Sequence, residues 1–520
     1  MNVLKQRLLL LMLCGSFAVQ AQLTDSIAVN QNTFYRPFET ALWETPLFYT
    51  SQQLHDYTQT QLDFRQADRH FKRVQTAAKT SEIRFLTKGI FNIQPRLRLF
   101  GDFEFRNTTE QELGYNLSTE RTEYQNVLSP NYFFAPKKGD WKIQHYTLDG
   151  GFTYAFRNGL LLGATAVYRT GKHYRIVDPR PEIVAARYGA TLHGGYVLGK
   201  HRIFAAAGMG KNTETATIMY VQDAQNAPAY PETFTRFSSG YGRVLFNSSF
   251  NSYIYNTIDR NLATGYQFQN ARNSLSVRYK YDKSLQDFYR KNAEGQVLID
   301  DAQIAYRYRV VTHKTAAQYF HDGAQRDYNV QLSYEQQQGD NFSVAEDGQN
   351  FRKNLDRASL TAGIIHKQQQ RVAYAAEFGI VYSKHAYIDL LGSTDKRLNT
   401  IETQLSVNRD VWANAANRLN IEVQGSYYFA TDQNLSFVPA ASNTSFADNV
   451  IFPDHAYDVT AKCVPRMAVH YYISLPKTKT LRIFADYSAN IAVGDRYLSY
   501  YNNLDTKSSS IFNMGIAINY

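Results

Sequence analysis

The sequence predicts an all-β protein, a transmembrane antiparallel up-and-down β-barrel of about 18 strands. Three observations predict it: apolar and polar residues alternate in run after run, short turns alternate with long polar segments, and the chain opens on an export signal. The alternation is clearest at residues 508–520, where Phe512, Met514, Ile516 and Ile518 fall on one face. A period of two is typical of a strand with different surroundings on its two sides.

Residues 1–21 have the pattern of a secretory signal peptide. Lys5 and Arg7 precede an apolar run over 8–19, and Ala21 stands at the −1 position of a cleavage site. The apolar run is too short to span a bilayer comfortably. We therefore expect export, with the mature chain starting at Gln22.

Composition narrows the kind of membrane protein that this chain could be. The mean hydropathy is −0.44, and no later stretch approaches the roughly 20 apolar residues of a membrane-spanning helix. A closed barrel is the other structure that satisfies every backbone group in hydrocarbon. The 39 Tyr and 32 Phe residues suit the aromatic girdles of such barrels. The net charge of +10 is interleaved along the chain, so it indicates no nucleic-acid surface.

Three segments organise the predicted chain: the signal peptide 1–21, an arm over 22–53 and a barrel over 54–520. The arm does not alternate and contains Pro37 and Pro46. We interpret it as a periplasmic or lumen-entering arm. It could form a small plug, or it could be an ordered tail lying on the mouth of the barrel.

Counting the alternating runs gives 18 strands, with 14 or 16 as the alternatives where alternation is weak. An even number places both ends of the barrel in the periplasm. Pro465 lies inside one run and cannot donate to a ladder, which predicts a bulge there. The predicted strands are 54–66, 80–93, 96–108, 141–156, 160–174, 184–198, 201–215, 258–269, 273–289, 300–319, 326–338, 355–366, 371–388, 397–411, 417–431, 456–474, 478–496 and 508–520.

Short turns and long connections alternate between these runs. The short ones lie at 157–159, 199–200, 270–273, 367–370 and 476–479. The long ones lie near 109–139, 216–257, 339–354 and 432–455. Short periplasmic turns and long external loops are the pattern of outer-membrane barrels. A soluble sandwich would need only about half as many strands per domain.

The polar faces of the strands carry charges of both signs at strand centres, which predicts a wet lumen with apolar residues turned to lipid. A field across a pore would sort solutes by charge. The alternative is a salt-bridge lattice that fills and stiffens the barrel. A surplus of Arg and Lys would favour anions if the lumen is open. The candidate lumen-facing residues are Arg96, Arg98, Asp102, Glu104, Arg106, Arg278, Lys280, Asp282, Arg307, Arg309, Arg482 and Asp486.

Other candidates carry less weight. The aromatic residues of 216–257 could stack sugars or anchor a partner, but ordinary packing in a folded cap or hairpin explains them better. Asp454 and His455 could form an acid–histidine pair at the rim, and the competing interpretation is a turn leading into a strand. The twelve histidines follow no metal-binding motif. We expect no metal, no cofactor and no enzyme activity.

The chain as a whole resembles uncharacterised, porin-like outer-membrane β-barrel proteins of the Bacteroidetes type. The resemblance lies in the Gln22 start, the segment 128–132 (Leu-Ser-Pro-Asn-Tyr) before a glycine-rich strand, and the terminal Asn519-Tyr520. It implies a Gram-negative outer membrane and little chemistry. The last strand also resembles the closing strand of such barrels, in which an aromatic end is read by the barrel-assembly machinery; here that signal would be Phe512 and Tyr520.

The functional expectation is porin-like passage of small solutes across the outer membrane. One alternative is a non-conducting structural or partner barrel of an envelope transport or secretion complex. A barrel hydrolase is the third and weakest hypothesis. The expected surroundings are outer-membrane lipid and lipopolysaccharide, the barrel-assembly machinery during insertion and an envelope partner protein, with no nucleic acid.

Overall fold

The computed structural model describes residues 46–47, 57–123, 125–245, 252–289, 296–368, 371–414, 416–439, 444–476 and 479–520. The predicted signal peptide over 1–21 lies outside the described residues, as does the predicted arm except for Pro46 and Leu47.

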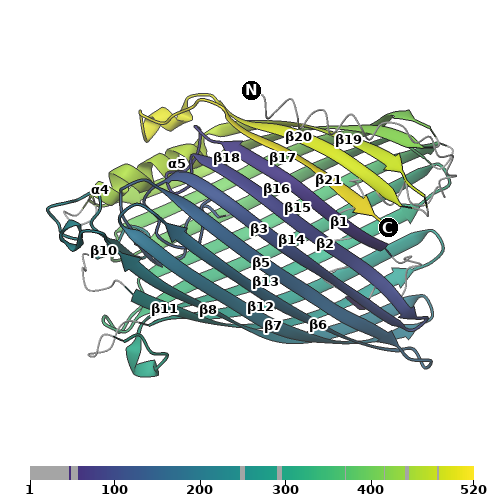
Figure 1. The fold of residues 1–520 in the computed structure, drawn as a ribbon, viewed down its shortest axis with the longest axis horizontal. Coiled ribbons are helices and arrows are strands. Elements are labelled where there is room, and N and C mark those ends of the chain that lie inside the picture. Colours follow the sequence, from purple (N-terminus) through teal and green to yellow (C-terminus); the bar gives the residue numbers. More distant parts are fainter. Residues whose placement is uncertain are drawn as a thin grey trace.

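The described residues form one closed 18-stranded antiparallel sheet, in which each strand pairs with its neighbours along the chain and the last pairs with the first (Figure 1). The 18 strands are β1 (Tyr57–Asp68), β2 (Lys79–Gln94), β3 (Leu97–Leu113), β5 (Gly139–Ala155), β6 (Leu160–Arg175), β7 (Arg180–Leu198), β8 (His201–Met219), β11 (Ser252–Gln269), β12 (Asn273–Tyr289), β13 (Ile304–Asp322), β14 (Arg326–Ser343), β15 (Phe351–Gln368), β16 (Arg371–Asp389), β17 (Thr394–Ala413), β18 (Asn417–Phe437), β19 (Ala461–Ser474), β20 (Thr480–Val493) and β21 (Ser509–Asn519).

The predicted count of 18 strands is confirmed, and most predicted boundaries lie within a few residues of the observed ones. The barrel closes between β1 and β21, where Thr58 and Tyr520 exchange two backbone hydrogen bonds of 2.7 and 2.9 Å. Closure removes both sheet edges, so the ladder has no unpaired strand.

The run 456–474 departs from the sequence prediction in two ways. The run 456–474 was expected to be strand throughout, but β19 starts only at Ala461 and a helix precedes it. The bulge expected at Pro465 is also wrong. The pairing of β19 with β20 keeps one register on both sides of Pro465 and is merely interrupted at 464–465, while Pro465 stands opposite Gly425 of β18.

The strands have an apolar outward face and a polar inward face. The loop residue Phe133 belongs to one buried cluster with residues of β5, β7, β8, β11, β12 and β13, and only the inside of a closed barrel brings so many strands to one loop. The residues that alternate with its contacts therefore point outward. They include Leu192, which is 70% exposed, and Met209, which is 67% exposed. Rows of exposed apolar side chains on a closed sheet are typical of barrels that face hydrocarbon.

The two ends of the barrel differ. One end, here the short-turn end, carries the tight connections 95–96, 199–200 and 270–272 between strands. The other, the long-loop end, carries the connections 69–78, 114–138, 220–251, 438–460 and 494–508 among others. The start of β1 and the end of β21 both lie at the short-turn end, opposite the helices α4 and α5 (Figure 1).

The long loops contain structure of their own. β4 (Asn131–Phe134), β9 (Arg236–Ser239) and β10 (Val244–Leu245) form a small antiparallel sheet. The segment 444–459 is helical throughout, as α4 (Thr444–Phe446), the π-helix η5 (Ala447–Ile451) and α5 (Phe452–Val459). Short 3-10 helices are η3 (Asp223–Gln225), η4 (Asp301–Gln303) and η6 (Arg496–Ser499). Within the described residues, no helix is long and apolar enough to cross a bilayer.

Leu47 is buried inside the barrel near the short-turn end. It packs with the inward-facing Ile90, Phe100, Leu161 and Phe204. Its side chain also lies over two glycines, and a Cβ built on Gly195 would stand 3.0 Å from one of its methyl carbons. Glycine is required here because any side chain would push Leu47 away from the wall.

Candidate functional site

The helical segment 444–459 occupies the long-loop mouth beside β17 and β18 (Figure 1). Its buried residues lie at 446–447, 450–451, 453–456 and 458–459, so buried positions recur every three to four residues as on a helix with one face inward. Pro453 stands where the π-helix η5 passes into α5, and it cannot donate a backbone hydrogen bond to the preceding turn. Thr460 ends the helix in an extended conformation, and its hydroxyl donates to the carbonyl of Ala456 at 2.6 Å.

A buried ion cluster, here called the Asp458 cluster, lies at the end of α5. It consists of Asp458 of α5 together with Arg73 and Lys396. The Arg73 Nε donates to Asp458 Oδ1 at 2.7 Å, and the Lys396 Nζ donates to Asp458 Oδ2 at 2.6 Å. Lys396 and Asp458 are fully buried. Arg73 comes from the β1–β2 connection and Lys396 from β17, so the cluster joins the helix to distant parts of the rim.

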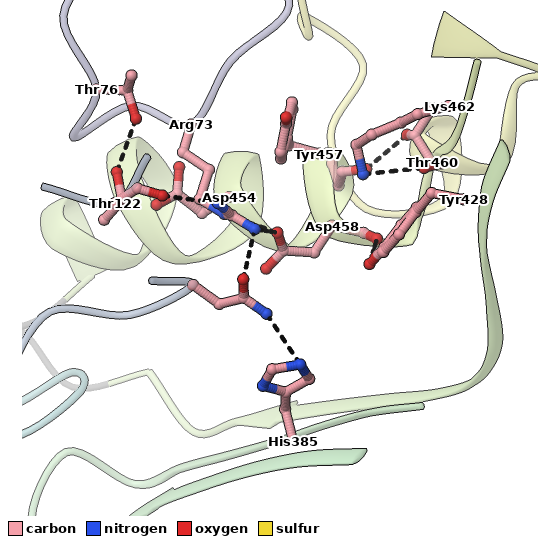
Figure 2. Close-up of polar contacts among 12 residues, drawn as sticks. Arg73, Thr76, Thr122, His385, Tyr428, Asp454, Tyr457, Asp458, Thr460 and Lys462 are labelled. Atoms are coloured by element: carbon pink, nitrogen blue, oxygen red, sulfur yellow. Dashed lines mark hydrogen bonds and ion pairs between the residues drawn. The ribbon is translucent and has the colours of Figure 1, made fainter. Parts of the chain in front are cut away.

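Arg73 is the hub of this cluster. Its remaining guanidinium nitrogens donate to the carbonyl of Thr122 at 2.8 Å and to the Asn126 side chain at 2.9 Å. Asn126 in turn contacts His385 Nε2 of β16 at 3.4 Å (Figure 2). The loops 69–78 and 114–138 are thereby tied to α5 and to the barrel wall.

The pKa values of Asp454 and Asp458, the two carboxylates of α5, are shifted in opposite directions. Burial by itself raises the pKa of Asp458, but the charges of Arg73 and Lys396 outweigh burial and hold that pKa well below its usual range. Burial raises the pKa of Asp454 to about 6, although the backbone N–H of Val74 donates to its carboxylate at 2.7 Å. One carboxylate is thus locked in its charged form, and the other is poised to take up a proton in mild acid.

A cavity of about 630 Å³, here called the lumen chamber, lies beneath α5 and against the inner wall from β14 to β20. Four cations line it, Arg73, Lys353, Arg357 and Lys462, against two acids, Glu335 and Glu402. Its remaining lining includes Gln337, Ser383, His385, Tyr387, Thr400, Tyr428, Tyr457 and Asn490. A polar chamber with an excess of positive charge can hold a small anionic or polyhydroxylated solute.

Lys462 lies where the chamber meets α5. Its ammonium lies 4.0 Å from the ring centroid of Tyr428 and 4.3 Å from that of Tyr457. Its hydrogen bond goes to the carbonyl of Thr460 at 3.1 Å (Figure 2). Aromatic faces attract a desolvated cation, so these rings stabilise the lysine without neutralising it.

The other half of the long-loop mouth is closed by apolar packing. Phe133 of β4 stacks on Tyr253, with 5.1 Å between ring centroids, and meets Phe237 edge-on at 4.9 Å. Phe288 and Tyr306 complete this aromatic cluster. Phe237 and Tyr253 belong to the aromatic stretch 216–257, whose interpretation as packing in a folded cap fits their burial.

Most of the predicted lumen-facing charges share the inward face of the wall. On β3, Phe100 packs on Leu47 inside the barrel. The same face of the strand carries Arg98, Asp102, Glu104 and Arg106. By the same register argument, Arg278, Lys280 and Asp282 of β12 and Arg482 and Asp486 of β20 point inward. Arg96 lies in the 95–96 turn.

Many of these charges are paired along the wall. Arg106 lies 2.6 Å from Glu104, Lys280 lies 2.9 Å from Asp282, and Asp486 lies 3.6 Å from Arg466. Arg482 donates to Gln61 across the β20–β21–β1 seam at 2.9 Å. These contacts are of the kind expected for a stiffening lattice.

The assignment of Arg307 and Arg309 to the lumen is wrong. Tyr306 and Tyr308, which alternate with them on β13, are buried among inward-facing rings, so the two arginines point outward. They pair there with Asp287 and Asp340. The apolar-outward rule fails because this end of β13 lies beside the folded loops, which bury tyrosines from the inside.

Asp454 and His455 do not form an acid–histidine pair, and they do not lie in a turn that leads into a strand. Both are buried in α5, and the Asp454 carboxylate is used by Val74. The His455 ring meets Tyr500 edge-on at 4.4 Å. Burial and the charge of Lys396 lower the pKa of His455 to about 3. Within the described residues, no group of three or more His, Cys, Asp or Glu side chains could hold a metal ion.

Sequence reasoning missed the Asp458 cluster and much of the lumen chamber. Arg357 and Glu402 could have been found, since both alternate with apolar residues in predicted strands. The helix was hidden because its buried face carries Asp454, His455 and Asp458, which have the pattern of a polar loop. No local signal connects Arg73 to Asp458, which lies 385 residues further along the chain.

A sequence profile of a family of unknown function, DUF6850, matches residues 46–520. A search of curated protein sequences gave no match. Among solved structures, the chain is similar to the outer-membrane transporter YddB from Escherichia coli, with 9% identity over 90% of this chain and 81% of that one, at a TM-score of 0.39. It is also similar to the copper transporter OprC, with 8% identity, 90% and 80% coverage and a TM-score of 0.44. OccAB2 from Acinetobacter baumannii has 11% identity, 89% and 97% coverage and a TM-score of 0.35.

Proposed function

We propose that this chain, which belongs to the DUF6850 family of unknown function, is an outer-membrane transport barrel that passes small polar solutes, with a preference for anions. Passage runs through the lumen chamber and is gated by α5 at the long-loop end. The proposal includes the predicted localisation, with the short-turn end toward the periplasm.

The lumen chamber is the observation that carries this proposal. Its volume of about 630 Å³ suits a small solute, and its lining has four cations and two acids. Two of the cations, Lys353 and Arg357, come from the inward face of β15, with Arg357 opposite Glu335 of β14. Solvated cations on a channel wall raise the local concentration of anions.

A gate at the long-loop end is supported by the way α5 is held. The Asp458 cluster joins α5 to β17 and to the 69–78 connection through buried charges, which add to the apolar packing of Val459 on Leu398 and Ala430. Removing one member of a buried ion cluster leaves the others uncompensated. A variant that breaks the cluster should therefore release the helix while leaving the barrel ladder untouched.

Single-channel recording in planar bilayers tests the proposal. The wild-type protein should show brief, infrequent openings, and Asp458→Asn should raise the open probability several-fold because α5 is released. The matched control is Asp395→Asn on the outward face of β17, whose pair with Arg397 is exposed and should leave gating unchanged. Migration of unboiled protein on an SDS gel checks that each variant has folded.

Ion selectivity supplies the second measurement. In a salt gradient, the reversal potential of the open channel should indicate anion preference, and Lys353→Gln with Arg357→Gln should reduce it. Folded Asp458→Asn and Leu47→Gly proteins that both lack conductance would overturn the transport proposal.

The second candidate is a non-conducting partner barrel, and the position of Leu47 favours it. Leu47 fills an apolar seat inside the short-turn end, while α5 and the aromatic cluster occupy the long-loop end. If neither Asp458→Asn nor Leu47→Gly yields conductance, this candidate takes precedence. Cross-linking in envelopes of the native host should then capture a defined partner.

A further inference from the structure

Three cations cluster on the outward wall of the barrel, away from the lumen. Lys211 of β8, Arg260 of β11 and Lys283 of β12 lie on three consecutive strands of the sheet. Arg260 stands directly opposite Lys283 in the ladder, and Lys211 stands opposite Ile258, two residues from Arg260. We call this group the outer cation trio.

The outward orientation of the trio follows from its neighbours. On β8, Lys211 lies on the same face as the exposed Met209. The opposite face carries Glu214 and Ala216, which are buried against the folded loops. On β11, Arg260 alternates in phase with Leu262, which is 57% exposed. On β12, Lys283 continues the row of Val277, Tyr279 and Tyr281.

The trio lacks the counter-charges found elsewhere on the outer wall. Arg307 pairs with Asp287, Arg309 with Asp340 and Lys172 with Glu182. Across the described ranges, by contrast, none of the three trio residues forms an ion pair or a side-chain hydrogen bond. Like charges directly opposite each other on one face of a ladder repel. An external anion between Arg260 and Lys283 would remove this repulsion.

The height of the trio on the wall indicates which anion it meets. From the short-turn end, the outward row of β12 runs through Leu275, Val277, Tyr279 and Tyr281 before it reaches Lys283. Apolar residues followed by tyrosines and then by cations is the order expected on crossing from hydrocarbon into lipid headgroups. With the long-loop end outside, these headgroups belong to the outer leaflet.

We propose that the outer cation trio binds a phosphate group of an anionic, phosphorylated glycolipid of the outer leaflet. Arg260 can donate two parallel hydrogen bonds to one phosphate, and the two lysines act as point charges on either side. The interface raises the strength of these contacts because water is partly excluded there. The site rests on the membrane orientation of the proposed function, but not on conduction.

Native mass spectrometry of the detergent-purified full chain tests the site, with lipid A as the probe. Wild-type protein should bind lipid A, and the double variant Arg260→Gln with Lys283→Gln should lose about tenfold in affinity, equivalent to about 1.4 kcal/mol. The matched control is Lys280→Gln with Lys314→Gln. These lysines also face each other across two strands, but on the inward face, with Asp282 and Glu335 as partners. The control should bind lipid A within about twofold of wild type.

Two further probes separate the sources of phosphate. Lipid A stripped of its phosphates should bind the wild-type protein as weakly as the double variant binds intact lipid A. Inorganic phosphate at millimolar concentration should not displace the bound lipid. Displacement by inorganic phosphate, equal binding of the stripped lipid, or unchanged affinity of the double variant would each overturn the proposal.

The result is independent of channel activity. A protein that binds lipid A but never conducts contradicts the proposed transport and leaves the lipid site standing. If the double variant fails the gel-migration check for folding, Lys211→Gln at the edge of the trio provides the test, with an expected loss of about threefold. If that folded variant binds lipid A with unchanged affinity, the result contradicts the site.

Discussion

Both halves of the long-loop mouth are closed by apolar packing, and one of them is also held by buried charges. Beside β5–β13, the loops are held by the aromatic cluster around Phe133, a continuous apolar core. Beside β14–β20, a second apolar cluster contains Phe446, Val450 and Ile451 of the segment 444–459. The buried charges of Arg73, Lys396 and Asp458 hold this segment in addition. Apolar packing depends on buried area and changes little with pH or a single charge. An ion cluster is lost in one step when a member is neutralised or removed.

We infer from this difference that the aromatic half of the mouth is fixed and that the ionic half can move. The aromatic half is held by a large apolar cluster, so we expect it to stay closed as long as the barrel is folded. The ionic half lies directly above the lumen chamber, and Arg73 belongs both to the cluster and to the chamber lining. A solute that competes for Arg73 would therefore weaken the contacts that hold α5.

Truncation of the aromatic cluster should have the largest effect on stability. Phe133→Ala removes a fully buried ring and leaves a cavity, so it should cost about 3–5 kcal/mol of unfolding free energy. Urea unfolding in detergent micelles measures this cost. Tyr230→Ala, in the neighbouring long connection 220–251 and 51% exposed, is the control and should change the midpoint little. Similar losses for both variants would mean that the cluster is not a core.

Asp458→Asn should destabilise the ionic half by about 3 kcal/mol, because Arg73 and Lys396 would stay buried without a counter-charge. Limited proteolysis within 438–460 should become faster, whereas cleavage within 114–138 beside the aromatic cluster should not. Equal acceleration at both sites would show that the two halves open together and would remove the distinction between them.

Asp454→Asn should stabilise the protein, whereas Asp458→Asn should destabilise it. The folded-state pKa of Asp454 is raised from 3.8 to about 6, so the folded protein binds this proton more tightly than the unfolded chain. The contribution of this carboxyl group to the stability of the protein is therefore greatest in acid, and it falls as the pH rises from about 4 to 6. The amide mimics the protonated form, so it should stabilise the protein by roughly 1–3 kcal/mol at pH 7.5.

Thermal unfolding between pH 5 and 8 measures this effect. The wild-type and Asp454→Asn curves should approach each other toward pH 5 and separate toward pH 7 and above. Asp458 should contribute no slope in this range, because its pKa lies well below its usual value and its carboxylate stays charged. A constant offset between the two curves would contradict the assignment to Asp454.

Breaking a lumen-wall pair should have the smallest effect. Lys280→Gln removes an ion pair with Asp282 in which both side chains are about one-third to one-half exposed, so we expect a loss of about 0–1 kcal/mol. Thermal unfolding at low and at high salt provides the measurement. A loss comparable to that of Asp458→Asn would mean that the wall lattice, rather than the mouth, carries the electrostatic stability.

Particular residues show how far sequence reasoning reached. Leu275, Val277, Tyr279 and Tyr281 alternate with charged residues, and this phase alone predicted both the strand and the inward face of Lys280. The same rule placed Arg307 and Arg309 on the wrong face, because Tyr306 and Tyr308 are apolar partners of folded loops rather than of lipid. The helix at 444–459 escaped detection for a related reason, since its buried face carries charged residues.

The sequence by itself determined the 18 strands, their order and most of their facing, because period-two alternation is a local property and a meander joins each strand to the next one along the chain. Only the tertiary structure decided how the long-loop mouth is closed and which charges meet there. Contacts such as Arg73–Asp458 depend on loops that fold into a shared interior, where burial makes a charge depend on whichever distant partner reaches it. No local pattern encodes that meeting.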